Sequence, residues 1–281
     1  MNVKDAELTV QGLWEQDVPA WNTHWVPIFR KFSQELIYKA QLRPGQIVLD
    51  VGTGTGAAAF DAAKRIKNGF VIGIDRSSRM IAVARAESKT SHRNIFFIEM
   101  SGDRLLFPSR LFGRVISNCG ISPGTFRQTS AEISRVLRDD GIFASSEFHL
   151  IDVNPHRTFS EILRKCRTDN PSRKLSTWRE ALATIESLGN QDSDSKRKIL
   201  RRVGFKRISV FTKTFRIILP NTQHYLKMRF QRIALRQELI ELPQVRRRKL
   251  LTELRKSLET YTHDGQFAFN WKVNFTVAKK Q

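Results

Sequence analysis

Residues 47–57 read Ile-Val-Leu-Asp-Val-Gly-Thr-Gly-Thr-Gly-Ala, an apolar run that ends in an acid and alternating glycines. The apolar part is typical of a parallel strand covered on both faces, and the glycines allow a turn so tight that a ligand can touch the backbone. The next residues, 57–64, favour a helix whose first N–H groups point back toward that turn. The stretch therefore predicts a strand, a nucleotide-type cofactor loop and a helix.

Strands and helices alternate along the chain after this loop. We expect further strands over 70–75, 94–98, 114–118, 142–148, 208–219 and 267–278. Helical segments are predicted between them, and a long basic helical stretch over about 222–261 is broken at Pro243. Because repeated βα units build parallel sheets, the chain is predicted to be an α/β protein with a doubly wound, Rossmann-like sheet.

The pattern divides the chain into four regions. They are an N-terminal helical cap (1–40), a cofactor-binding core (41–151), a helical insertion (152–200) and C-terminal strands of the sheet (201–281) with a basic helical insertion at 222–262. In the cap, an aromatic stripe that includes Trp21, Trp25 and Phe32 fits one face of a helix started or interrupted near Pro27. Such a stripe is more often core packing than a ligand cage.

Composition limits the class of protein. The 281 residues are 40% hydrophobic, which suits one sizeable α/β domain with an appended element. No apolar run approaches the ~18 residues of a membrane span, and the first residues lack a signal pattern, so we expect a soluble, cytoplasmic protein. Cys119 and Cys166 are too few and too far apart for a disulfide framework or a zinc site. No metal site is predicted.

The formal net charge of +21 is concentrated at one end of the chain. From residue 196 to the end, 22 Lys and Arg stand against 5 Asp and Glu. Such a surplus suits an anionic acceptor, an anionic membrane surface or nucleic acid, and it is equally compatible with a solvated cationic face.

Asp50 decides between two cofactor classes for the glycine loop. The spacing Gly52-x-Gly54-x-x-Ala57 also satisfies a dinucleotide fingerprint. A carboxylate at the strand end would sit poorly beside a pyrophosphate, because two anions would share one small space. S-adenosylmethionine carries a sulfonium and an ammonium group and no phosphate, so an acid beside the glycines favours this cofactor.

Several blocks of the chain resemble the class I S-adenosylmethionine-dependent methyltransferases, in particular the ubiquinone/menaquinone-biosynthesis type that acts on small molecules. The resemblance is strongest over about 44–150, and its blocks are residues 48–56, 73–81, 105–108 and 132–141, with Gly204-Phe205 further on. It implies a sheet of seven strands with the last antiparallel and a cofactor across the carboxyl ends of the first strands.

The resemblance also implies roles for particular residues. Gly52, Gly54 and Gly56 would approach the methionine part of the cofactor, and Asp50 would order it. Asp75 would accept the ribose hydroxyls. The remaining predicted cofactor contacts are Thr53, Arg76, Met80, Ser101, Gly102, Asp103 and Asn118. An acid for the adenine amino group is often found at the end of the third-strand block, where this chain reads Met-Ser-Gly-Asp over 100–103, so Ser101, Asp103 or a backbone group would serve.

Methyl transfer from a sulfonium is an in-line displacement, so much of the acceleration comes from holding donor and acceptor in contact. A base is needed only if the acceptor must lose a proton, and His149 and His24 are the best-placed candidates. A lone histidine is more often structural. Cys119 is expected to be a small buried thiol and not a nucleophile.

The favoured function is methyl transfer to a small-molecule acceptor, with an anionic or a lipid-like one considered. Two alternatives stay open. The first is an RNA or protein methyltransferase that docks through the basic C-terminal third, with affinity that falls steeply with salt. The second is a non-catalytic binding module that keeps the fold. Peripheral contact with a membrane is a further possibility for the basic helices.

Overall fold

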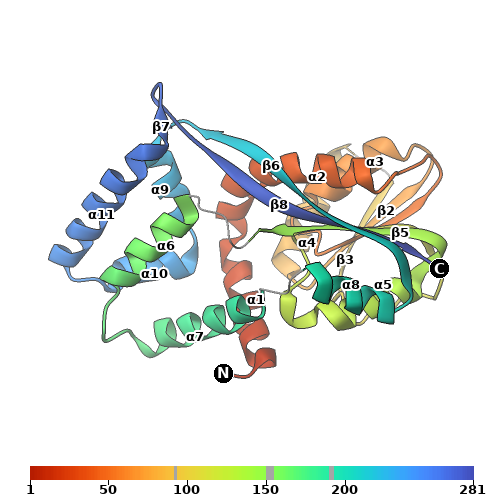
Figure 1. The fold of residues 1–281 in the computed structure, drawn as a ribbon, viewed down its shortest axis with the longest axis horizontal. Coiled ribbons are helices and arrows are strands. Elements are labelled where there is room, and N and C mark those ends of the chain that lie inside the picture. Colours follow the sequence, from red (N-terminus) through yellow and green to blue (C-terminus); the bar gives the residue numbers. More distant parts are fainter. Residues whose placement is uncertain (92–93, 150–154, 190–192) are drawn as a thin grey trace.

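The computed structural model describes residues 1–91, 94–149, 155–189 and 193–281. In these residues a single sheet has the strand order β3-β2-β1-β4-β5-β8-β6 (Figure 1). The strands are β1 (Ile47–Val51), β2 (Phe70–Asp75), β3 (Ile95–Glu99), β4 (Phe112–Asn118), β5 (Leu137–Phe148), β6 (Phe205–Leu219) and β8 (Gln266–Lys280), with a two-residue β7 (Thr262–His263) beside β8.

Neighbouring strands from β1 to β5 are parallel, whereas β8 runs antiparallel to both β5 and β6. The predicted Rossmann-like sheet of seven strands with the last antiparallel is therefore confirmed. The carboxyl ends of β1, β2 and β4 meet at one edge, which is where open α/β sheets bind ligands.

Helices cover both faces of this sheet. One face carries α2 (Val26–Lys39), α3 (Ala57–Arg65) and α4 (Ser78–Ser91), whose apolar side chains share a core with the strands. The other face carries α5 (Phe126–Val136) and α8 (Ser193–Arg202), which close a second core. The region predicted as one helical insertion, 152–200, is therefore not a single unit, because α8 packs against the sheet.

A separate helical lobe stands at the far end of the long β6–β8 pair (Figure 1). It consists of α6 (Pro155–Cys166), α7 (Arg173–Leu188), α9 (Thr222–Phe230), α10 (Ile233–Glu241), α11 (Gln244–Leu258) and the 3₁₀ turn η3 (Glu259–Tyr261). The basic helical stretch predicted over 222–261 is therefore three helices. Its apolar positions Leu226, Leu254 and Leu258 are fully buried and share a core with Phe159 of α6.

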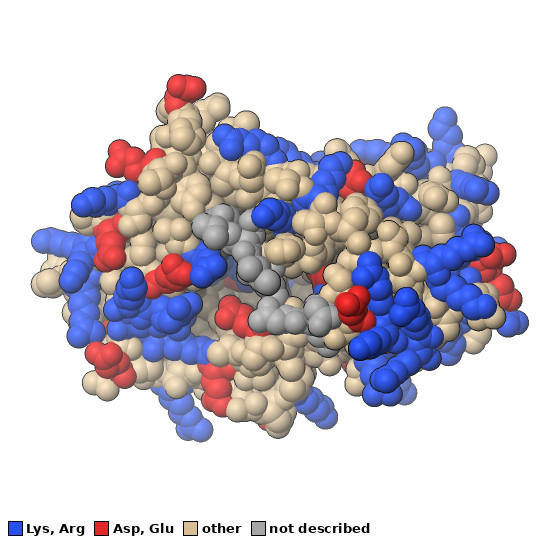
Figure 2. Space-filling model, viewed as in Figure 1, with Lys and Arg blue, Asp and Glu red and all other residues tan. Residues whose placement is uncertain are grey.

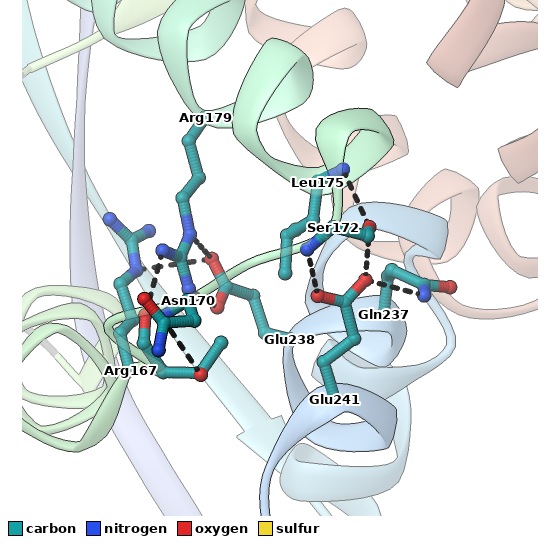
Figure 3. A network of polar contacts seen from close by, with 9 residues as sticks. Arg167, Asn170, Ser172, Leu175, Arg179, Gln237, Glu238 and Glu241 are labelled. Carbon is teal, nitrogen blue, oxygen red and sulfur yellow. Dashed lines mark hydrogen bonds and ion pairs between the residues drawn. The ribbon is translucent and has the colours of Figure 1, made fainter.

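Two acids of α10 connect this helix with its neighbours in the lobe (Figure 3). Glu238 of α10 is 3% exposed and forms ion pairs with Arg179 of α7 at 2.6 Å and with Arg167 at 3.1 Å. Glu241, one turn further along α10, accepts hydrogen bonds from the backbone N–H and the hydroxyl of Ser172. Because Arg179 donates through two N–H groups to both oxygens of this buried carboxylate, the pairing fixes how α10 lies against α7.

The N-terminal segment lies between the lobe and the sheet (Figure 1). The helix α1 (Val3–Ala20) continues through a π-helical turn, η1 (Trp21–Trp25), directly into α2. Pro27 stands in the first turn of α2, directly after the π-helical turn. Of the helices in the described ranges, none is both long and apolar enough to span a membrane.

Two glycines bring the loops after β1 and β4 into backbone contact. Gly52 has a φ of 68°, and a Cβ built on it would lie 2.5 Å from the Cα of Gly120. A Cβ on Gly120 would lie 2.6 Å from the carbonyl oxygens of Gly52 and Val51. Neither position has room for a side chain, so both loops depend on glycine at this crossing.

Gly120→Ala tests this crossing. The added methyl meets backbone atoms that cannot rotate away, so we expect the free energy of unfolding to fall by about 1–3 kcal/mol, the range for overpacking. Chemical denaturation measures the change. Gly12→Ala is the matched control, since nothing lies within 4 Å of a Cβ there and the helix α1 should gain about 0.5–1 kcal/mol. Equal stability of Gly120→Ala and the unsubstituted protein would contradict the crowding.

Candidate functional site

A cavity of about 620 Å³ lies at the carboxyl ends of β1, β2 and β4. Its other walls come from α1, the π turn η1, and the lobe helices α7, α9 and α10. The cap and the lobe therefore cover the edge of the sheet that the glycine loop occupies.

Asp50 lies in the cavity wall at the end of β1 and is completely buried. One carboxylate oxygen accepts a hydrogen bond of 2.7 Å from the hydroxyl of Thr53, and the other has no hydrogen-bond partner among the described residues. Burial, with a smaller contribution from the nearby charge of Asp75, raises the pKa of Asp50 to about 7. Asp50 is thus a buried acid that pairs with no cationic side chain in the described part of the chain.

Asp75 lies in the same wall at the end of the neighbouring strand β2. Its two oxygens accept hydrogen bonds of 2.9 Å, one from the backbone N–H of Gly54 and one from that of Ser77. Burial raises the pKa of Asp75, and these two hydrogen bonds oppose the rise. Each oxygen has a second lone pair, so Asp75 fastens the glycine loop and can still accept a hydroxyl.

The three glycines of the loop have different roles. Gly52 and Gly54 line the cavity with φ of 68° and 57°. Gly56 does not line it, and a Cβ there would meet the rings of Phe60 and Phe97 at 2.7 and 2.8 Å. Gly56 is therefore required for packing of α3 on the sheet, while Gly52 and Gly54 leave space at the ligand.

Arg76 and Met80 both line the cavity beyond Asp75. Arg76 donates to the carboxylate of Glu7 at 2.7 Å, and Gln11 donates to the Arg76 carbonyl at 3.0 Å. These contacts connect α1 to the end of β2. Met80 is buried.

The other predicted cofactor residues fall into two groups. Thr53, Ser101, Gly102 and Asn118 line the cavity. Asn118 donates to the carbonyl of Phe29 at 3.1 Å, so its amide also links β4 to α2. Asp103 is exposed and lies outside the lining.

Neither predicted base lines the cavity. The ring of His24 packs edge-on against His224 at 5.6 Å, and burial lowers its pKa. His149 directly follows two residues that do line the cavity, Glu147 and Phe148. Cys119 lines the cavity, and burial raises the pKa of its thiol to about 12, so the thiol stays protonated.

Aromatic rings form a part of the cavity wall that reaches the glycine loop. Trp21 stacks on Trp25 with ring centroids 6.3 Å apart and meets Phe29 edge-on at 4.6 Å. A Cβ on Gly54 would lie 3.7 Å from Nε1 of Trp21. The stripe that the sequence indicates as core packing is therefore both core and cavity wall.

Charged residues of the lining come partly from elements that the sequence pattern does not connect with the site. They include Glu7 and Asp17 of α1, Glu186 of α7, Arg229 of α9, and Arg232 just before α10. No local motif marks these residues, because the packing of the lobe and α1 against the sheet brings them to the cavity. The spacing of these residues along their helices does not indicate that they face a cavity.

The surplus of basic residues in the C-terminal third lies mainly outside the cavity. Figure 2 shows Lys and Arg gathered over α8 and α11 on the face drawn. The basic residues of these two helices are Lys196, Arg197, Lys198, Arg201, Arg202, Arg246, Arg247, Arg248, Lys249, Arg255 and Lys256. None of them lines the cavity.

Comparison with known proteins identifies the central part of the chain. A family model described as a methyltransferase domain matches residues 48–141. A ubiquinone/menaquinone biosynthesis C-methyltransferase of Wigglesworthia glossinidia brevipalpis is 30% identical over 125 residues, which are 43% of this chain and 50% of that protein. A demethylmenaquinone methyltransferase of Symbiobacterium thermophilum is 31% identical over 123 residues, 42% of this chain and 49% of that protein. The chain spans about half the length of these relatives.

Solved structures share the fold. The YcgJ protein from Bacillus subtilis superposes with a TM-score of 0.57 at 17% identity and covers 89% of this chain and 97% of its own. A Haemonchus contortus phosphoethanolamine N-methyltransferase 2, solved with S-adenosyl-L-methionine, gives a TM-score of 0.53 at 18% identity and covers 89% of this chain and 52% of its own. The resemblance seen in the sequence blocks is thereby confirmed: residues 48–141 of this chain match a methyltransferase domain, and the fold is shared with solved methyltransferases.

Proposed function

We propose that this protein transfers a methyl group from S-adenosylmethionine to a small-molecule acceptor held in the cavity. The observation that carries the proposal is Asp50, a fully buried acid in the wall of a cavity beside a glycine turn, with one oxygen that accepts no hydrogen bond from the described residues. A buried acid of this kind calls for a cation, and the sulfonium cofactor supplies two positive groups and no phosphate.

The lining supports an arrangement of the cofactor along the edge of the sheet. Gly52 and Gly54 would accommodate the methionine part beside Asp50, and Asp75 would accept the ribose hydroxyls through its remaining lone pairs. Met80, Ser101 and Gly102 lie in the lining where the adenine would follow. Because Asp103 lies outside the lining, we propose Ser101 or a backbone group for the adenine amino contact.

The acceptor would lie against the aromatic wall. Trp21, Trp25 and Phe29 present apolar surfaces, which suits a flat or lipid-like molecule. The curated relatives described above are named as quinone-biosynthesis methyltransferases, which supports a small acceptor of this kind.

Catalysis would rest chiefly on holding the methyl carbon and the attacking atom in line. His24 and His149 remain the predicted bases for an acceptor that must lose a proton. Since neither ring lines the cavity, we expect His24→Asn and His149→Asn to lower kcat less than tenfold, whereas loss of a general base costs about 10²–10⁴-fold. A loss of 100-fold or more in either variant would identify the base.

The alternatives gain no support from the comparisons. The basic surfaces of α8 and α11 lie outside the cavity, and the curated relatives named above are small-molecule methyltransferases. An RNA methyltransferase would bind RNA at low salt with affinity that falls steeply as salt rises.

Asp50→Asn tests whether Asp50 requires a cation. The quantities compared are the pH dependence of unfolding and the pH dependence of S-adenosylmethionine binding. In the free protein the raised pKa of about 7 keeps Asp50 protonated between pH 4 and 7, where the unfolded chain has lost that proton. The free energy of unfolding therefore falls as pH rises through this window. A bound cation restores the ionised form, so the affinity for S-adenosylmethionine should rise about tenfold between pH 5.5 and 7, with release of a proton.

Calorimetry in two buffers of different ionisation enthalpy measures that proton. Asp50→Asn should weaken binding, abolish the proton release and remove this part of the pH dependence of unfolding. Asp139→Asn, at an exposed acid outside the lining, is the control and should behave like the unsubstituted protein. Proton release that persists in Asp50→Asn would contradict the assignment.

Asp75→Ala tests the ribose contact. Loss of a charged acceptor should weaken binding of S-adenosylhomocysteine by about 1–3 kcal/mol, measured by calorimetry at one pH. Ser101→Ala and Asp103→Ala, measured beside it, separate the two candidate side chains for the adenine. Unaltered affinity in Asp75→Ala would refute the ribose assignment.

A further inference from the structure

Three arginines line the cavity, and two of them have carboxylate partners. Arg76 pairs with Glu7 at 2.7 Å, and Arg232 pairs with the buried Asp17. Arg229 of α9 is the third. Among the residues that the structure describes, no carboxylate lies within ion-pair distance of its guanidinium.

The contacts of Arg229 hold the guanidinium in place without neutralising it. Nη1 donates to Nδ1 of His156 at 3.0 Å, and the guanidinium carbon lies 4.5 Å from the ring centre of Phe159. The Nε group is buried and has no acceptor in the described part of the chain. Arg229 is therefore a positioned, partly desolvated cation with unused donors.

Neighbouring titratable groups do not supply the missing charge. His156 accepts from Arg229 and is fully buried, and burial followed by the charge of Arg229 keeps its pKa well below the usual value, so it is neutral. Tyr225 lies 2.9 Å from the same nitrogen, and burial raises its pKa, so it is neutral as well. Glu186 lines the cavity, but it is an exposed side chain beyond ion-pair distance.

A series of aromatic contacts connects Arg229 with the glycine loop. Trp21 lies at Gly54 and stacks on Trp25. The ring of Trp25 lies 5.9 Å from that of His156, which bonds to Arg229. An apolar wall therefore lies between the acidic end of the cavity, at Asp50, and the arginine.

We propose that the part of the cavity at Arg229 is an oxyanion subsite, and that the acceptor is a flat or apolar molecule bearing a carboxylate or a phosphate that pairs with this guanidinium. The guanidinium fork matches both oxyanions, and a partly buried site strengthens the pairing. The identification of the ligand as the methyl acceptor rests on the proposed function; the subsite itself rests on Arg229 and its surroundings.

The test compares charged and neutral probes of the same shape. Calorimetry measures binding of 2-naphthoate, 2-naphthyl phosphate and the neutral 2-naphthamide to the unsubstituted protein. We expect at least one of the two anions to bind about tenfold or more tightly than the amide, which corresponds to one hydrogen-bonded charge pair. The anion that binds more tightly indicates whether the acceptor carries carboxylate or phosphate. Equal affinity of both anions and the amide would overturn the proposal.

Three variants test whether Arg229 causes the preference for anionic probes. Arg229→Gln should remove the preference for the anion, and Arg229→Lys should keep part of it because the charge remains. Glu186→Gln, a change to the acid of the lining whose charge acts on Arg229, should keep or increase the preference. A preference that survives unchanged in Arg229→Gln would also overturn the proposal.

Binding of S-adenosylhomocysteine, measured on every variant, checks the fold and separates the two claims. If S-adenosylhomocysteine binds but the probes show no charge preference, the oxyanion subsite fails and the proposed function stands. If the preference is present and S-adenosylhomocysteine does not bind to the unsubstituted protein, the subsite stands and the proposed function fails.

Discussion

The buried carboxyl group of Asp50 is the constraint on which the arrangement of this cavity depends. Asp50 lies near the carboxyl end of β1, between β2 and β4, and Thr53 is the one side chain that donates to it in the described residues. A buried acid without a cation costs stability in the free protein, as its raised pKa indicates. A ligand that brings positive charge to the end of β1 would offset this cost.

The rest of the fold encloses that position. The backbone crossing of Gly52 and Gly120 holds the loops after β1 and β4 together, and Asp75 fixes the glycine turn from β2. The long β6–β8 pair carries the helical lobe out to where it faces the cap (Figure 1). Within the described ranges, Asp50 has no cationic partner and Arg229 has no carboxylate partner, and both line this one cavity. The charges suit a cationic donor and an anionic acceptor.

The sequence predicts the core well because its signals there are local. Apolar runs, glycines and acids at strand ends follow directly from the needs of a buried parallel sheet, so the strands appear within a few residues of their predicted bounds. Asp50 and Asp75 were found in the same way, from their place at strand ends beside glycines. The π turn at Trp21–Trp25 and the division of residues 152–200 between lobe and sheet depend on tertiary packing, which no local pattern reports. Arg229 was missed for that reason, and His149 shows that a place at a strand end fixes the backbone and not the side chain.

The most direct test is transfer of a labelled methyl group. The protein is incubated with methyl-labelled S-adenosylmethionine and an extract of its source cells, and the label is measured separately in RNA, protein and small molecules. We predict that the label appears in a small molecule, and that Asp75→Ala loses most of this transfer. Label recovered in RNA or protein instead would contradict the account.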